Sequence, residues 1–359
     1  MAVIGTKEQP IRRACLVCDP FLVKNGAAGR VTGLLDAMGA QWEIFDQVIP
    51  NPTVELVSQG VAHILDYQPD TVIALGGGSA IDTGKAISFI YTNATGAEKP
   101  RCIAIPTTSG TGSEVTSFSV LSDPSAGAKY PLVDNQMLPE VALLDPSLTV
   151  SVPPQVTADT GLDVLTHAAE AYASTGASDF TDALAEKACA LVLEHLPRAV
   201  KNGEDLEARE KLHAASCMAG MAFNSAGLGM CHAMAHALGE QLHLPHGRCN
   251  ALLLPHVIGF NAGLGETGSF SAQARYAALA KRMGLCCYNE GVAVRSLIKQ
   301  VQELMSQVSI APKLAEQAQR EELRGALEQI CALAQKDSCL ESNPRPASAE
   351  QMASILSQL

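Results

Sequence analysis

The hydrophobic pattern of this chain changes once, near residue 150, and this change constrains the fold more than any other feature. Before it, short apolar runs alternate with helical patterns and glycine-rich turns. Four of these runs have the length of buried strands, and they cover residues 14–18, 71–75, 102–105 and 141–144. Strands that are apolar on both faces are typical of a parallel sheet with helices on both sides. We therefore expect an α/β domain with a mostly parallel sheet over residues 1–150.

The chain after Ser151-Val152-Pro153-Pro154 is rich in alanine, leucine and methionine and has few β-branched runs. Residues with high helix propensity dominate this part, which favours helices over strands. The predicted helices cover residues 156–174, 180–199, 207–226, 230–241, 271–283, 290–305 and 320–333. The second domain, residues 151–359, is therefore expected to be all-helical.

Charge and cysteine content exclude several classes of protein. A net charge of −12 over 359 residues disfavours nucleic-acid and membrane-surface partners. No apolar run reaches the roughly 18 residues that a membrane span needs. The eleven scattered cysteines suggest reduced thiols, with a structural role for Cys15 and Cys18. The first residues, MAVIGTKEQP, lack the apolar core of a signal peptide, which predicts a cytoplasmic location.

A glycine-rich turn, Gly76-Gly77-Gly78-Ser79, lies between a predicted strand and a predicted helix. Backbone N–H groups at such a helix N-terminus suit a pyrophosphate. A second polar loop, residues 106–114, follows the next strand and carries hydroxyls that suit phosphate and sugar oxygens. Asp19, at the end of the first strand, suits a ribose and would repel a 2′-phosphate, which favours NAD over NADP. The simpler alternative is that Asp19 only starts a turn.

Histidines gather in the second domain at helical spacing. Asp163 and His167 lie four residues apart, as do His232 and His236, and His246 follows in a predicted loop after Pro245. Residues four apart share one face of a helix, so each pair could hold a single ion. One carboxylate with two or three imidazoles suits Fe(II), Zn(II), Co(II) or Ni(II). The spacing does not decide which of the histidines are ligands, and His243 and His256 also stay open.

Taken together, these motifs resemble those of the iron-containing (group III) alcohol dehydrogenases over almost the whole chain. The motifs are Gly76-Gly77-Gly78-Ser79 with Asp82 and Lys85, Pro106-Thr107-Thr108-x-Gly110-Thr111, Gly161-x-Asp163-x-Leu165-Thr166-His167-Ala168-x-Glu170, Gly227-Leu228-Gly229-x-x-His232-Ala233-Met234-Ala235-His236, Pro245-His246-Gly247, Leu254-Pro255-His256 and Asn343-Pro344-Arg345-Pro346. Two further segments, Lys129-Tyr130-Pro131-Leu132 and residues 178–186, are most similar to the propanol dehydrogenases of bacterial microcompartments.

The resemblance implies a dehydroquinate-synthase-like architecture, with a dinucleotide-binding first domain and a metal-binding second domain. It implies that Asp163, His167, His232 and His246 are the metal ligands, with Fe²⁺ as the expected ion and Zn²⁺ as the alternative. His236 then stands beside the metal as the catalytic residue. Around NAD(H) the resemblance places Asp19, Gly77, Gly78, Ser79, Asp82, Thr107, Thr108, Thr111 and Lys129.

The implied function is NAD(H)-dependent interconversion of a short-chain aldehyde and its primary alcohol, with propionaldehyde and 1-propanol as the expected pair. In this reaction the metal polarises the carbonyl oxygen and the nicotinamide supplies the hydride. Alternatives are a diol or polyol dehydrogenase, a lactaldehyde reductase or a dehydroquinate-synthase-like lyase of the same fold, and a non-catalytic metal-binding scaffold partner. The resemblance also implies a homodimer or higher homo-oligomer that works with microcompartment enzymes or shell. Family members usually begin with one more strand, so the amino-terminal sheet edge is expected to be shortened.

Overall fold

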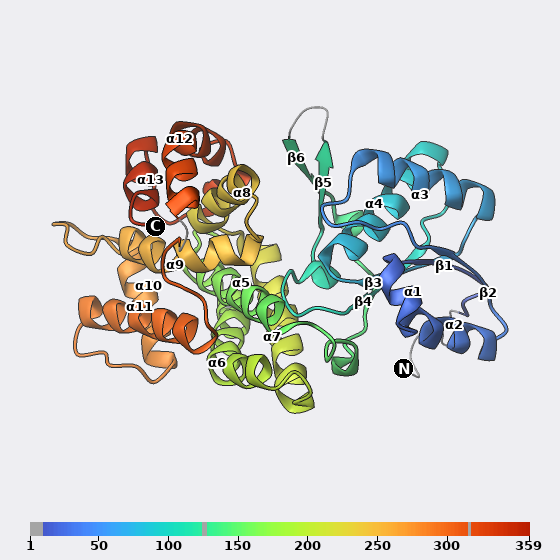
Figure 1. Ribbon diagram of the computed structural model, residues 1–359, viewed down its shortest axis with the longest axis horizontal. Coiled ribbons are helices and arrows are strands. Elements are labelled where there is room, and N and C mark those ends of the chain that lie inside the picture. Colours follow the sequence, from blue (N-terminus) through green and yellow to red (C-terminus); the bar gives the residue numbers. More distant parts are fainter. Residues whose placement is uncertain (1–9, 124–127, 315–316) are drawn as a thin grey trace. The chain divides into compact units, whose positions relative to one another are not determined.

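The computed structural model describes residues 10–123, 128–314 and 317–359. The chain forms two compact units, residues 1–149 and 150–359 (Figure 1). The expectation about a missing amino-terminal strand falls on residues 1–9, outside the described part.

The first unit is built on a five-stranded sheet in the order β2-β1-β3-β4-β7, in which every neighbouring pair is parallel. The expected α/β class is therefore confirmed. The strands are β1 (Arg13–Val17), β2 (Gln41–Phe45), β3 (Thr71–Gly76), β4 (Arg101–Pro106) and β7 (Val141–Ala142). The helices are α1 (Pro20–Lys24), α2 (Ala27–Ala37), α3 (Val54–Tyr67) and α4 (Gly78–Thr95).

Both faces of this sheet are buried, as the apolar strand sequences require. On one face, Leu16 and Ile73 belong to a core cluster that includes residues of α1 and α2. On the other face, Cys15 and Val72 belong to a cluster that includes residues of α3 and α4. Burial raises the pKa of the Cys15 thiol to about 12, so this cysteine is an inert part of the core.

Three strands of the first unit were not predicted. β2 lies at the sheet edge. Its residues Gln41 and Glu43 are exposed, and Trp42 and Ile44 are half-buried, so it lacks the apolar run that marks the inner strands. β5 (Phe118–Asp123) and β6 (Ala128–Val133) form a separate antiparallel pair. Both carry polar residues and an exposed valine, Val120 or Val133, which hides the strand pattern.

The second unit is all-helical, as predicted. Its helices are α5 (Pro154–Ala173), α6 (Asp179–Lys201), α7 (Leu206–Ala226), α8 (Met230–Leu242), α9 (His246–Asn261), α10 (Ser271–Arg282), α11 (Glu290–Gln307), α12 (Gln317–Ala334) and α13 (Ala349–Leu356). The prediction missed α9, which is buried along most of its length and contains Pro255, and α13, which has only eight residues. His246 is therefore the first residue of a helix, and the expectation that it lies in a loop was wrong. No described helix has both the length and the apolar character needed to cross a membrane.

Helix α4 carries the glycine-rich turn at its start, and it packs very closely on the sheet. A Cβ atom on Gly84 would lie 2.8 Å from the Cβ of Ala74 on β3, whereas a Cβ on Gly33 in α2 would meet nothing within 4 Å. Gly84 is therefore required by packing, and Gly33 is not.

We predict that Gly84→Ala lowers stability by about 1–3 kcal/mol, because α4 must move away from β3. The matched variant Gly33→Ala should stabilise by about 0.5–1 kcal/mol through helix propensity alone. Calorimetric melting of both variants beside the parent protein checks this. A Gly84→Ala protein that melts at or above the parent temperature would contradict the close packing of α4.

Candidate active site

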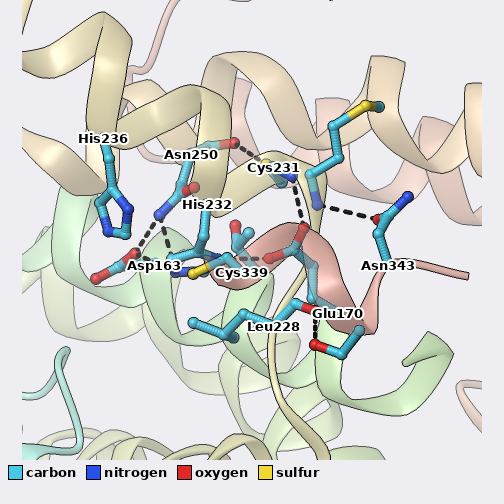
Figure 2. Close-up of polar contacts among 12 residues, drawn as sticks. Asp163, Glu170, Leu228, Cys231, His232, His236, Asn250, Cys339 and Asn343 are labelled. Carbon is cyan, nitrogen blue, oxygen red and sulfur yellow. Dashed lines mark hydrogen bonds and ion pairs between the residues drawn. The ribbon is translucent and has the colours of Figure 1, made fainter. Parts of the chain in front are cut away.

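The centre of the second unit is Asp163 on α5, which is only 4% exposed. Asp163, His167 and His232 each offer a ligand atom, and these atoms lie within 4.8 Å of one another. The Oδ1 atom of Asp163 lies 3.7 Å from Nε2 of His232 and 3.6 Å from Nε2 of His246. Helices α5, α8 and α9 thus bring all four predicted ligands to one point. Figure 2 shows two of them, Asp163 and His232.

The electrostatics of this cluster favour a charged carboxylate, and they shift its imidazoles in opposite directions. Burial alone would lower the pKa of His232, but its contacts with Asp163 and Glu170 outweigh burial and raise this pKa to about 9. Burial alone would raise the pKa of Asp163, but the imidazoles of His167, His246 and His232 outweigh burial and hold this pKa well below its usual range. Burial and the neighbouring imidazoles lower the pKa of His246. A carboxylate and a neutral imidazole are the forms of these side chains that bind metal ions.

Glu170 fixes the orientation of His232. This glutamate lies two turns beyond Asp163 on α5 and is 3% exposed. Its Oε2 lies 2.5 Å from Nδ1 of His232, and its Oε1 accepts a hydrogen bond of 2.6 Å from the backbone N–H of Cys231 (Figure 2). A hydrogen on Nδ1 leaves the lone pair of Nε2 facing Asp163, which is the arrangement that buried carboxylates impose on metal-binding histidines.

The N-terminus of α8, which carries His232 and His236, is held by side chains distant in sequence. Asn343 accepts a hydrogen bond of 3.0 Å from the N–H of Met230, beside the contact of Glu170 with Cys231 (Figure 2). A Cβ on Gly229 would lie 2.7 Å from Oδ1 of Asn343 and 2.8 Å from Oε1 of Glu170. Glu170 and Asn343 stand in sequence motifs of the chain, but this capping role was not predicted.

The hydrogen-bond partners of Asn250 show that the cluster presents acceptor atoms, as a cation site requires. Its Nδ2 atom donates to Oδ1 of Asp163 at 2.7 Å and lies 3.1 Å from Nε2 of both His232 and His246. An amide NH₂ has two hydrogens for these three acceptors. The Oδ1 of Asn250 is buried with no hydrogen-bond partner among the described residues. An acceptor-rich point of this kind, with one carboxylate and imidazole nitrogens, fits a first-row divalent metal.

Two contacts seat α9 on α5 and so position His246. A Cβ on Gly247 would lie 2.2 Å from the backbone oxygen of Asp159, so only glycine allows the approach. The next residue, Arg248, donates from Nε to Oδ1 of Asp159 at 2.7 Å. Asp159 lies one turn before Asp163 on α5, which sets the position of His246 relative to the centre of the cluster.

The spacing also left His236, His243 and His256 open, and of these three His236 contacts the cluster through the ring of His246. His236 pairs through Nδ1 with Oδ2 of Asp337 at 2.7 Å, and its ring stacks on His246 with centroids 5.0 Å apart. His243 ends α8 in the left-handed conformation with φ of 51°. His256 contacts Gln358 through Nδ1 at 3.1 Å.

The two loops predicted to bind the dinucleotide lie against each other in the first unit. A Cβ on Gly77 would lie 3.2 Å from Oγ1 of Thr108, and one on Gly78 would lie 2.7 Å from Cγ2 of Thr111. Gly77 is the N-cap of α4 and has no side chain to cap the helix, so this terminus suits an anion. Thr107 follows β4 and is buried, and Ser79 lies in the first turn of α4.

Asp19 lies beside the glycine turn. Its Oδ1 accepts from the N–H of Leu22 at 3.0 Å as the N-cap of α1, and its Oδ2 lies 4.0 Å from the position of a Cβ on Gly76. The carboxylate thus starts a turn, as the simpler alternative states, and it also borders the glycine turn. A contact of Asp19 with a ribose stays a prediction. The side chain of Lys129 lies outside the described part of the chain.

Asp82 and Lys85, both on α4, hold the polar loop in place through hydrogen bonds to Ser113. Oδ1 of Asp82 accepts from Oγ of Ser113 at 2.5 Å, and its Oδ2 accepts from the N–H of Val120 at 3.0 Å. Lys85 is 1% exposed, and its Nζ donates to the backbone oxygen and to Oγ of Ser113, both at 3.0 Å. Burial lowers the pKa of Lys85. These contacts give Asp82 a role in holding the loop, in addition to any direct contact with a cofactor.

Comparison with known proteins identifies the family. Residues 4–146 match the model of iron-containing alcohol dehydrogenases, and residues 157–359 match the C-terminal model of the Fe-containing alcohol dehydrogenase family. The chain belongs to the iron-containing alcohol dehydrogenase family. The expected family, fold and enzyme class are thereby confirmed.

Individual relatives share most of their length with this member of the family. The chain is 48% identical to the 1-propanol dehydrogenase PduQ of Salmonella typhimurium, over 96% of this chain and 92% of the relative. A solved 1,3-propanediol oxidoreductase superposes with a TM-score of 0.89 at 36% identity, covering 97% of this chain and 92% of that one. A sulfoacetaldehyde reductase from Bifidobacterium kashiwanohense, solved with NAD⁺, superposes with a TM-score of 0.82 at 30% identity, covering 97% and 91%.

We predict that Glu170→Gln weakens metal binding by about 10- to 100-fold, because an amide no longer requires the hydrogen of His232 to sit on Nδ1. The measurement is competition for Zn²⁺ between the purified apoprotein and a chromophoric chelator. Glu194→Gln, an exposed residue of α6, removes the same charge elsewhere and should leave the affinity unchanged. Equal affinities for the Glu170→Gln and parent proteins would show that Glu170 does not orient a metal ligand.

Proposed function

We propose that the protein interconverts a short-chain aldehyde and its primary alcohol with NAD(H) as the hydride carrier. The observation that carries this proposal is the convergence of one buried carboxylate and three imidazoles in the second unit. The 48% identity to a 1-propanol dehydrogenase supports propionaldehyde and 1-propanol as the substrate pair. The likeness to a 1,3-propanediol oxidoreductase supports hydroxylated aldehydes of the same size as a second class.

Asp163, His167, His232 and His246 would hold the metal, with Fe²⁺ as the ion the family favours and Zn²⁺ as the alternative. When bound, the metal supplies Lewis acidity toward the oxygen of the aldehyde or alcohol. Asp163 offsets part of the charge of the cation, and Glu170 keeps the lone pair of His232 available. Asn250 would have to turn its amide, because an NH₂ group cannot face a cation.

His236 would move the proton that accompanies hydride transfer. Its ring stacks on His246, a proposed ligand, and its side chain is 36% exposed. A histidine next to the substrate oxygen and open to water suits general acid–base catalysis. In the reducing direction His236 would give a proton to the substrate oxygen as the nicotinamide gives hydride to the carbonyl carbon.

The first unit would hold the dinucleotide through the turn at Gly77, Gly78 and Ser79 and through Thr107, Thr108 and Thr111. Asp19 beside this turn favours NAD(H), because its charge would repel the 2′-phosphate of NADP(H). The NAD⁺ complex of the sulfoacetaldehyde reductase supports the same choice. A homo-oligomeric state and a place in the cytoplasm or inside a bacterial microcompartment stay predictions from the sequence.

The proposal is tested by NADH oxidation, followed by absorbance at 340 nm, with the anaerobically Fe²⁺-loaded protein and propionaldehyde. We expect metal-dependent turnover, and at least tenfold lower kcat/KM with NADPH. Lactaldehyde and 3-hydroxypropionaldehyde in the same series separate the two substrate classes. His246→Ala should lose bound metal and turnover together, whereas the control His256→Ala, on the same helix, should keep both. Full turnover without metal, or a metal-loaded protein inactive toward every short aldehyde, would contradict the proposal.

A further inference from the structure

His236 and Asp337 form a polar pair that joins parts of the chain 101 positions apart. Nδ1 of His236 on α8 lies 2.7 Å from Oδ2 of Asp337. The side chains are 36% and 19% exposed, so the contact is partly shielded from water. Asp337 stands immediately before the short 3₁₀ helix η4 (Ser338–Ser342), and no sequence motif linked it to the histidines.

The carboxylate of Asp337 is itself held in place. Its Oδ1 accepts a hydrogen bond of 2.8 Å from the backbone N–H of Cys339, as the N-cap of η4. Burial alone would raise the pKa of Asp337, but His236 and Cys339 outweigh burial and hold this pKa below its usual range. An ionised carboxylate only accepts hydrogen bonds, so the hydrogen of this contact belongs to Nδ1 of His236.

The ring of His236 is restrained on its other sides as well. It stacks on His246 with an interplanar angle of 16° and meets the ring of His232 edge-on, with centroids 6.1 Å apart. Figure 2 shows His236 beside Asn250 and Asp163, at the border of the metal-ligand cluster. Its second nitrogen, Nε2, makes no hydrogen bond with any residue that the structure describes.

We propose that Asp337 is a positioning residue for proton transfer, which holds His236 in the Nδ1–H tautomer and leaves Nε2 as the proton-carrying atom. In alcohol oxidation, Nε2 accepts the hydroxyl proton while hydride passes from the alcohol carbon to NAD⁺, giving the aldehyde and NADH. In aldehyde reduction, the same proton passes from Nε2 to the substrate oxygen as NADH gives up its hydride. This inference rests on the proposed function, because it assigns a role within that reaction.

The competing explanation is that the pair only ties α8 to η4 as a structural contact. A double-mutant cycle with Asp337→Asn, His236→Asn and the double variant separates the two explanations. Positioning predicts that Asp337→Asn lowers kcat by about 10- to 100-fold at unchanged KM for NADH and unchanged metal content. It also predicts that the double variant is no slower than His236→Asn alone. The control Glu341→Gln, an exposed carboxylate within η4, should match the parent protein.

A spectroscopic measurement on the parent protein tests the tautomer of His236 even if Asp337→Asn fails to fold. Long-range ¹H–¹⁵N spectra of histidine-labelled, Zn²⁺-loaded protein report which ring nitrogen carries hydrogen, and His236→Asn assigns the signal. The proposal predicts Nδ1–H for His236 in the parent protein and a loss of this preference in Asp337→Asn.

Each outcome decides a different claim. Parent-like kcat in Asp337→Asn, multiplying effects in the double variant, or an Nε2–H tautomer in the parent protein would overturn the positioning role. Full activity of His236→Asn would overturn the role of His236 in proton transfer and the positioning role with it, but would leave the alcohol dehydrogenase function standing. Loss of metal in Asp337→Asn would show that the pair supports the metal site instead, which also overturns the proposal.

Discussion

The second unit depends on the burial of charge along one face of α5. Asp159, Asp163, His167 and Glu170 follow one another at spacings of four, four and three residues, and all are at most 6% exposed. Burying an unpaired carboxylate is costly, so each one needs partners from another helix. Arg248 pairs with Asp159, the imidazoles surround Asp163, and Glu170 accepts a hydrogen bond from the backbone N–H of Cys231 at the start of α8. The same contacts that satisfy these charges bring the proposed metal ligands together.

In the first unit, the buried side chain of Lys85 also draws its partners from another segment of the chain. Lys85 reaches from α4 to Ser113 and Thr116, and Asp82 reaches from the same helix to Ser113 and Val120. Polar contacts inside a dry environment fix loop geometry more firmly than contacts in water do. Side chains of α4 thus hold the loop between β4 and β5, in which Thr108 and Thr111 lie against the glycine turn.

Much of this organisation could be predicted from the sequence, because apolar runs and helical spacing report on burial. The inner strands, seven helices of the second unit and the pair Asp163 and His167 all follow from such patterns. The edge strand β2 and helix α9 do not, because one is half polar and the other is buried along most of its length. Because α9 was not predicted, Asn250 was not predicted as a site residue either, although it lies four residues after His246 on that helix. The contact of Asp337 with His236 could not be predicted, because the residues next to Asp337 in the sequence do not indicate a partner 101 positions away.

The central claim is that Asp163, His167, His232 and His246 hold the metal. X-ray absorption spectroscopy of the Zn²⁺-loaded protein tests it most directly, because it reports the ligand atoms without reference to activity. The account predicts a shell of nitrogen and oxygen at about 2.0–2.2 Å, with the multiple scattering of imidazole rings. A sulfur shell at about 2.3 Å would place a cysteine such as Cys339 on the metal, and a shell without imidazole would exclude the histidines; either result would contradict the claim.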